Sequence, residues 1–172
     1  MLIRLAEPGD AMAVGRVHVR SWQVAYRGLL ADEYLDQLRP EDRAQRYDFG
    51  TRDPLKPRTI VAVDGAAIQG FVSTMPSRDE DLADHGELCA LYVVPEQWGH
   101  GMGAALIKAA REHLFEDGFQ NALLWVLAGN DRATRFYEGD GWIADGHRRT
   151  DSVWGVTVSE VRYVRGLEAV NS

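Results

Sequence analysis

Three glycines stand at alternate positions, Gly99, Gly101 and Gly103, shortly after an apolar segment that ends at Pro95. Glycine permits φ > 0 and lets main-chain N–H groups approach a ligand without a Cβ in the way. The residues that follow have helical spacing, and the first N–H groups of a helix have no internal partner and lie at the positive end of its dipole. The main chain over residues 98–104 is therefore suited to an anion such as a pyrophosphate. A loop that only tightens strand–helix packing would use the same glycines.

Two classes of cofactor use such a loop. In a dinucleotide-binding α/β unit the loop follows the first strand, and an acidic residue about 20 positions later binds the ribose. Here the loop follows the fourth expected strand, and the later residues are Asn130 and the aromatic pair Phe136-Tyr137. This placement argues against a nicotinamide nucleotide.

Two motifs stand out along the chain. The first is Leu91-x-Val93-x-Pro95 with the three glycines after it, and the second is N-x-x-A-x-x-F-Y-x-x-x-G-W over residues 130–142. Together they resemble the signature motifs of the GNAT superfamily of N-acetyltransferases. The resemblance extends over residues 1–165 and implies acetyl-CoA as the acyl donor. The residues it implies for binding the donor are Leu91, Tyr92, Val93, Trp98, Gly99, His100, Gly101, Met102, Gly103, Ala104, Asn130, Arg132 and Phe136.

The chain departs from the family pattern at two positions. Trp98 stands where the family usually has Gln or Arg, and Trp142 stands where it usually has Phe. Because main-chain N–H groups are expected to hold the pyrophosphate, we expect Trp98 to remove one side-chain ligand without abolishing binding.

The resemblance also implies two catalytic residues. Tyr137 would lie near the sulfur of coenzyme A as the general acid, and Glu87, 14 residues before Gly101, would remove a proton from the amine. Such a glutamate has this offset in the histone-acetylating branch of the family. His85 and Tyr92 are alternative bases. In structural terms Tyr137 could instead be a core residue and Glu87 a solvated strand end.

The acceptor is expected to be an amine, in either a small molecule or a peptide. The family places acceptor recognition on the first two helices, which here carry Trp22, Tyr26 and Tyr34, although aromatic residues at helical spacing also suit a core. The acidic residues at 79–84 are expected to form a solvated loop that could attract a cation. A non-catalytic acyl-CoA-binding module and a protein lysine or N-terminal acetylase are alternative functions.

The elements that position these residues alternate along the chain. Strands are expected at 2–6, 59–63, 68–75, 87–94, 122–127, 142–147 and 156–164, and helices at 10–27, from 34 up to a break at Pro40, at 101–117 and at 130–138. This order predicts an α/β fold with a mixed sheet. The family resemblance implies a mostly antiparallel sheet, splayed between the fourth and fifth strands.

Composition sets the remaining expectations. The 172 residues, 45% of them hydrophobic, fit a single domain over 1–172, and the net charge of −7 disfavours nucleic acid as a partner. Neither a signal peptide nor a membrane-spanning segment is recognisable, and Cys89 is the only cysteine, so we expect a cytoplasmic protein. No residues show metal-ligand spacing, so we expect no metal. Dimers are common in the family, and a homodimer is possible here.

Overall fold

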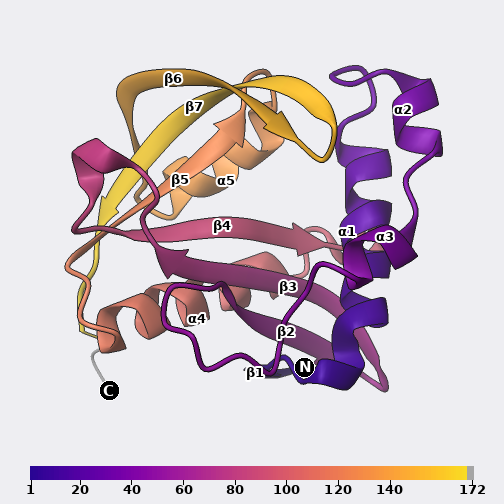
Figure 1. Ribbon diagram of the computed structural model, residues 1–172, viewed down its shortest axis with the longest axis horizontal. Helices are drawn as coiled ribbons and strands as arrows, with labels where there is room; N and C mark the ends of the chain where they lie inside the picture. The colour runs from indigo at the N-terminus through magenta and orange to yellow at the C-terminus, as the bar shows by residue number, and fades with distance from the viewer. Residues whose placement is uncertain (170–172) are drawn as a thin grey trace.

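The computed structural model describes residues 1–169 (Figure 1). The main elements in chain order are β1 (Leu2–Leu5), α1 (Ala11–Ala25), α2 (Asp32–Asp36), α3 (Pro40–Ala44), β2 (Arg58–Asp64), β3 (Ala67–Pro76), β4 (Gly86–Val93), α4 (Met102–Glu116), β5 (Asn121–Leu127), α5 (Asp131–Gly139), β6 (Ile143–Val153) and β7 (Val156–Gly166). Short 3-10 turns cover Pro8–Asp10, Glu80–Leu82 and Pro95–Gln97. Among the described residues, no helix combines the length and apolar character that crossing a bilayer requires.

The strands form one seven-stranded sheet in the order β1-β2-β3-β4-β5-β7-β6. Only β4 and β5 run parallel, and they pair at just two positions, Gly86 with Ala122 and Glu87 with Leu123. Beyond these pairs the two strands diverge toward their C-terminal ends (Figure 1). The predicted mixed sheet, splayed between the fourth and fifth strands, is confirmed.

A β-bulge in β4 lies next to this divergence. Ala90 pairs with Ser73 and Leu88 pairs with Thr74, so Cys89 is an extra residue with no partner on β3. The bulge resets the alternation of the strand. Leu88 and Leu91 consequently both pack against the core cluster that contains α4, while Glu87, Ala90 and Tyr92 face the opposite side.

The helices cover both faces of the sheet. Helix α4 repeats apolar residues at helical spacing, and with α5 it buries one face; its core residues are Met102, Leu106, Ile107, Ala110 and Leu114. Helix α1 covers the other face through Val14 and Val17, which pack against Val61 and Phe71.

The structure corrects three expected boundaries. The first helix ends at Ala25 rather than at 27, and the second helical stretch is two short helices separated before Pro40, since proline begins a helix more readily than it continues one. The last two strands extend to 153 and 166 and meet in a two-residue turn, Trp154-Gly155. Both turn residues have positive φ, 52° and 79°, as a type I′ hairpin requires.

Candidate functional site

A cavity of about 1160 Å³ opens where β4 and β5 diverge. We call one part of it the glycine-loop half; its lining includes Leu91, Val93, Trp98, Gly99, Gly101, Gly103, Ala104, Asn130, Arg132, Phe136 and Tyr137. The other part, the aromatic half, is lined from the α1 side of the sheet by His18, Trp22, Tyr26, Arg43, Tyr47, Tyr92 and Trp154, and by the charged residues Arg78, Glu87, Arg149 and Glu160. The divergence of the strands thus connects the two faces of the sheet.

The glycine loop presents main-chain donors to this cavity. Gly99 and Gly101 have φ of 76° and 86°, and Gly101 is the N-cap of α4 in the left-handed conformation. A Cβ added at Gly99 or Gly101 would meet no protein atom within 4 Å, so the chain passes an open space at both positions. Ala105 is the first residue whose N–H bonds back to Gly101, at 3.0 Å. The donors over 102–104 are therefore positioned for an anion.

Trp98 links the end of β4 to α5 beside the glycine loop. Its indole Nε1 donates to the Val93 carbonyl at 2.8 Å, and that carbonyl also accepts from Ser21 Oγ at 3.1 Å. The guanidinium carbon of Arg132 lies 3.5 Å from the centroid of the Trp98 ring. Trp98 therefore supports a cation from α5 next to the glycine loop, a role that its position in the sequence did not indicate.

Two other predicted loop side chains lie elsewhere. His100 is exposed and does not line the cavity. The side chain of Met102 is buried in the core between α4 and the sheet. Only their main-chain groups are available to a ligand in this cavity. Asn130 caps α5, since its Oδ1 accepts from the Ala133 N–H at 3.2 Å.

Tyr137 projects from α5 into the cavity. Its side chain is buried, with the Phe136 and Trp142 rings edge-on at centroid distances of 5.5 and 6.4 Å. Burial, and the nearby Tyr92, raise the pKa of the Tyr137 phenol well above its ordinary value. The group therefore keeps its proton at neutral pH and can donate it in a hydrogen bond.

Glu87 is buried, not a solvated strand end. It is 2% exposed, and its Oε1 accepts from the main-chain N–H and the Nε of Arg78, at 3.1 and 3.4 Å. Its Oε2 accepts from Arg78 Nη2. Burial, and then the Glu87 charge, raise the pKa of the neighbouring Cys89 thiol to about 12, so this cysteine stays protonated.

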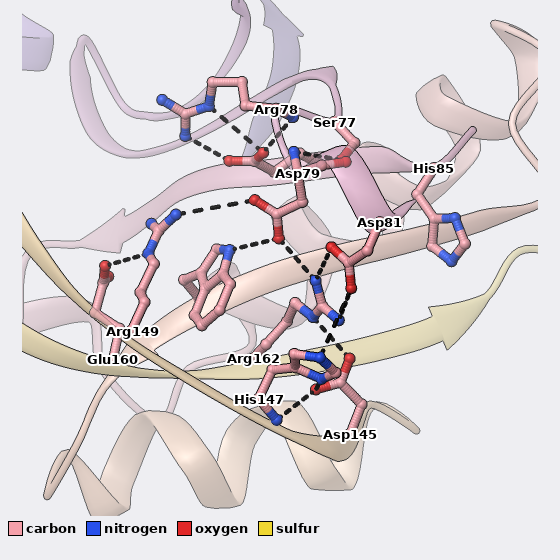
Figure 2. A network of polar contacts seen from close by, with 12 residues as sticks. Ser77, Arg78, Asp79, Asp81, His85, Asp145, His147, Arg149, Glu160 and Arg162 are labelled. Carbon is pink, nitrogen blue, oxygen red and sulfur yellow. Dashed lines mark hydrogen bonds and ion pairs between the residues drawn. The ribbon is translucent and has the colours of Figure 1, made fainter. Parts of the chain in front are cut away.

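A second carboxylate, Glu160 on β7, lines the aromatic half. Its Oε1 accepts from Arg149 Nε at 3.0 Å, and among the described residues its Oε2 has no hydrogen-bond donor. Burial raises the pKa of this carboxyl. The Arg149 guanidinium lies 4.2 Å from the centroid of the Trp125 ring (Figure 2 shows Arg149 between Asp79 and Glu160). No motif pointed to Glu160, because its neighbours come from distant strands.

The expectation of a solvated acidic loop is wrong for Asp79, whose side chain is 12% exposed, whereas Asp81 stays exposed although it is ion-paired. Asp79 and Asp81 both bind Arg162, which is 2% exposed, and Asp145 from β6 binds it too at 2.7 Å (Figure 2). The hydrogen bond from Arg162 lowers the pKa of Asp81 to about 2. These carboxylates therefore form structural ion pairs with Arg162 and are not free to bind a cationic acceptor.

Of the three residues predicted to bind the acceptor, two line the cavity and one does not. Trp22 and Tyr26 are buried yet line the aromatic half, where the Tyr26 hydroxyl lies 3.3 Å from that of Tyr92. Tyr34 does not line the cavity; its hydroxyl donates to the Trp154 carbonyl at 2.5 Å and ties α2 to the β6–β7 turn. His85, one of the alternative bases, also lies outside the lining and bonds Asp84 instead.

His18 lies at the centre of the aromatic half. Its Nδ1 is 2.8 Å from the Tyr47 hydroxyl, and its ring stacks on Tyr92 at 4.8 Å and tilts against Trp154 at 5.0 Å. Burial, and then the charge of Arg43, lower the pKa of His18 well below its ordinary value. The imidazole is therefore neutral at pH 7.

Comparison with known proteins gives a consistent result. A model described as the acetyltransferase (GNAT) family matches residues 20–142. An uncharacterised N-acetyltransferase of Archaeoglobus fulgidus is 35% identical over 140 residues, which cover 80% of this chain and 89% of that protein.

Two solved structures share the fold. A GCN5-related N-acetyltransferase from Rhodopseudomonas palustris superposes with a TM-score of 0.75 at 21% identity, covering 96% of this chain and 95% of that one. PaiA N-acetyltransferase from Thermoplasma acidophilum, in complex with coenzyme A, has a TM-score of 0.68 at 20% identity, covering 94% and 98%.

Proposed function

Because this chain belongs to the GNAT family of acetyltransferases, we propose that it moves an acetyl group from acetyl-CoA directly to an amine bound in the aromatic half of the cavity. The observation that carries this proposal is the glycine loop, whose free N–H groups lie at one end of a cavity that continues between β4 and β5 to the opposite face. Donor and acceptor can thus meet from the two sides of the sheet.

The glycine-loop half suits the donor. Main-chain N–H groups over 102–104 would hold the diphosphate, and Arg132 on the Trp98 ring adds a positive charge beside them. The Val93 carbonyl already accepts two hydrogen bonds, so the pantetheine arm would use other main-chain groups on the open side of β4, at Leu91 and the Val93 N–H. The coenzyme A in the Thermoplasma protein supports the choice of donor.

The transfer forms one C–N bond and breaks one C–S bond. An alkylammonium with a pKa near ~10.4 must first give one proton to a base, because only the neutral amine attacks the thioester carbon. As the amide forms, the nitrogen loses a second proton and the thiolate departs. Tyr137 would stabilise this thiolate with a hydrogen bond from its hydroxyl, and the nitrogen's second proton converts the thiolate to the thiol through solvent.

Two carboxylates are candidates for the base. The sequence predicts Glu87, but both of its oxygens accept hydrogen bonds from Arg78. Glu160 lines the same half of the cavity and keeps one oxygen without a donor among the described residues. A carboxylate with an unoccupied lone pair accepts a proton more readily, so we assign the larger part of the base function to Glu160.

The direct test mixes the protein with acetyl-CoA and a panel of primary amines and follows free thiol. Amine-dependent thiol release is expected. Tight binding of coenzyme A with no thiol release across a broad panel would show instead a non-catalytic acyl-CoA-binding module.

A further inference from the structure

Arg43 differs from Arg78 and Arg149, two other arginines that line the aromatic half. Arg78 is paired with Glu87, and Arg149 is paired with Glu160. Arg43 lies half-buried at the end of α3 and lines the cavity, yet no carboxylate within residues 1–169 pairs with it, and its buried Nε donates no hydrogen bond there. Its guanidinium lies instead over the Trp154 ring, 4.6 Å from the centroid. A partly desolvated cation without a counter-ion is costly unless a ligand supplies one.

A second arginine reinforces this positive end of the cavity. Arg46 stands one helical turn after Arg43, lines the same cavity from its exposed rim, and also has no ion-pair partner in the described part of the chain. The side chains at positions i and i+3 of a helical turn are neighbours. Both arginines thus line the cavity from α3 and the turn that follows it.

A carboxylate lines the same half of the cavity. Glu160 reaches it from β7 and Arg43 from α3, and the rings of Trp22, Trp154 and Tyr92 line it too. The Trp22 ring lies 4.9 Å from that of Trp154 and 6.5 Å from that of Tyr92, between centroids. Burial raises the pKa of the Tyr92 hydroxyl, the Glu160 carboxylate adds to the rise, and Arg43 opposes it. The aromatic half thus combines a carboxylate, a guanidinium and aromatic walls.

We propose, building on the function assigned above, that the acceptor is a small amino-acid-like amine whose own carboxylate binds Arg43. Its ammonium would face Glu160, and an apolar side chain would lie against Trp22 and Trp154. A guanidinium binds a carboxylate with two parallel hydrogen bonds, which fixes the orientation of the acceptor as well as its affinity.

A carboxylate fits this environment better than the other possible groups. The lining also contains the acidic residues Asp48, Asp151 and Glu160, which would repel a dianion such as a phosphate monoester. At the corresponding place a lysine side chain presents methylene groups and the N-terminus of a protein presents an uncharged amide, and either would leave Arg43 without a counter-ion. The unpaired arginine therefore favours a free amino acid over a protein as the acceptor.

The experiment compares three acceptors with the same side chain: tryptophan, tryptamine and tryptophanamide, and likewise leucine, isoamylamine and leucinamide. Free thiol is followed for the wild type and for Arg43→Gln, Arg43→Lys and Arg39→Gln. The ratio of kcat/KM for the acid to that for its amide is the readout, because a partly unfolded variant changes both terms equally.

We expect the wild type to prefer the acid, and Arg43→Gln to lower the ratio about 10- to 100-fold, the range for a hydrogen bond to a charged group. Arg43→Lys should keep part of the preference. Arg39→Gln removes a charge nearby but outside the cavity, where Arg39 faces Glu41, and should leave the ratio unchanged.

Three results would overturn the assignment. Preference for the amide or the amine in the wild type would point to a peptide or a simple amine as the acceptor. An unchanged ratio in Arg43→Gln would place the carboxylate elsewhere. Both of these outcomes leave the acetyltransferase itself intact, whereas no thiol release with any acceptor would refute the proposed function together with this inference.

Discussion

In the proposed mechanism, departure of the thiolate depends on Tyr137. Replacing it by Phe removes one hydroxyl from a buried ring and leaves its packing against Phe136 and Trp142 in place. We expect kcat to fall about 10²-fold, as for loss of one hydrogen bond to a developing anion, while the Kd of coenzyme A stays the same. Thiol-release kinetics and calorimetry measure the two quantities. Equal turnover by the variant would remove Tyr137 from the mechanism.

Glu87 and Glu160 are compared by two isosteric variants, Glu87→Gln and Glu160→Gln. The base matters most at low pH, where more of the acceptor amine is protonated. We therefore expect the loss of kcat/KM in Glu160→Gln to be larger at pH 6.5 than at pH 9.5. At pH 6.5 the loss in Glu87→Gln should be smaller than the loss in Glu160→Gln. A pH-independent ratio of wild type to Glu160→Gln would contradict our assignment of the base.

Cys89 is the residue that could carry the acetyl group covalently in a two-step transfer. Its thiol lies at the bulge of β4 and lines the cavity, but burial and Glu87 raise its pKa to about 12, so almost none of it is the nucleophilic thiolate at neutral pH. We expect Cys89→Ala to retain activity. Intact mass spectrometry of the wild type with acetyl-CoA alone should show no acetylated protein; a stoichiometric acetyl adduct at Cys89 would indicate a two-step transfer.

For single residues, the sequence predicted those features that depend on neighbouring positions in the chain. The positive φ of Gly99 and Gly101 and the entry of Tyr137 into the cavity follow from motifs within a few positions. The support of Arg132 by Trp98 joins residues 34 positions apart, and the pairing of Glu87 with Arg78 depends on how the loop before β4 folds back. Such partners are set by tertiary packing and leave no local pattern.

Among the elements, the crossing of α1 and α3 places Arg43. A Cβ at Gly15 would lie 2.6 Å from the Pro40 carbonyl oxygen and 3.5 Å from the Ala44 nitrogen, so Gly15→Ala must move α3. We expect the KM for the acceptor to rise while the Kd of coenzyme A is unchanged, because the glycine loop lies on another element. Gly9→Ala, where a Cβ meets no atom within 4 Å, is the control. Unchanged acceptor kinetics in Gly15→Ala would separate α3 from acceptor binding.

Element type was predictable where the apolar pattern was strong, as in the helical spacing of α4 and the continuous apolar run of β5. The splay of the sheet came from family resemblance, because a parallel pair that separates after two positions has no signature in the residues themselves. The second half of β6 was missed since the turn that follows it uses Trp154 at φ 52°, a conformation that bulky side chains rarely adopt. Packing of Trp154 against His18, Trp22 and Arg43 holds it there.

For the whole molecule, the ion pairs of Arg162 with Asp79, Asp81 and Asp145 join the loop before β4 to the β6–β7 hairpin. The pKa of Asp81 is lowered from 3.8 to about 2 in the folded state, so its ion pair stabilises the fold above about pH 4 and this contribution is lost as the pH falls toward 2. We expect Asp81→Asn to be less stable than the wild type at pH 7 and to show a shallower loss of stability between pH 4 and 2. Urea unfolding across this range measures both; parallel curves would contradict the linkage.

Calorimetry on two matched variants tests whether the glycine loop holds the diphosphate of coenzyme A. Gly101→Ala and Gly118→Ala impose similar backbone strain, at φ of 86° and 99° at opposite ends of α4, and in neither does the new Cβ meet a protein atom within 4 Å. We expect Gly101→Ala to raise the Kd of coenzyme A about tenfold or more, and Gly118→Ala to leave it unchanged. Equal affinity in both variants, or binding of a nicotinamide nucleotide in place of coenzyme A by the wild type, would contradict the account.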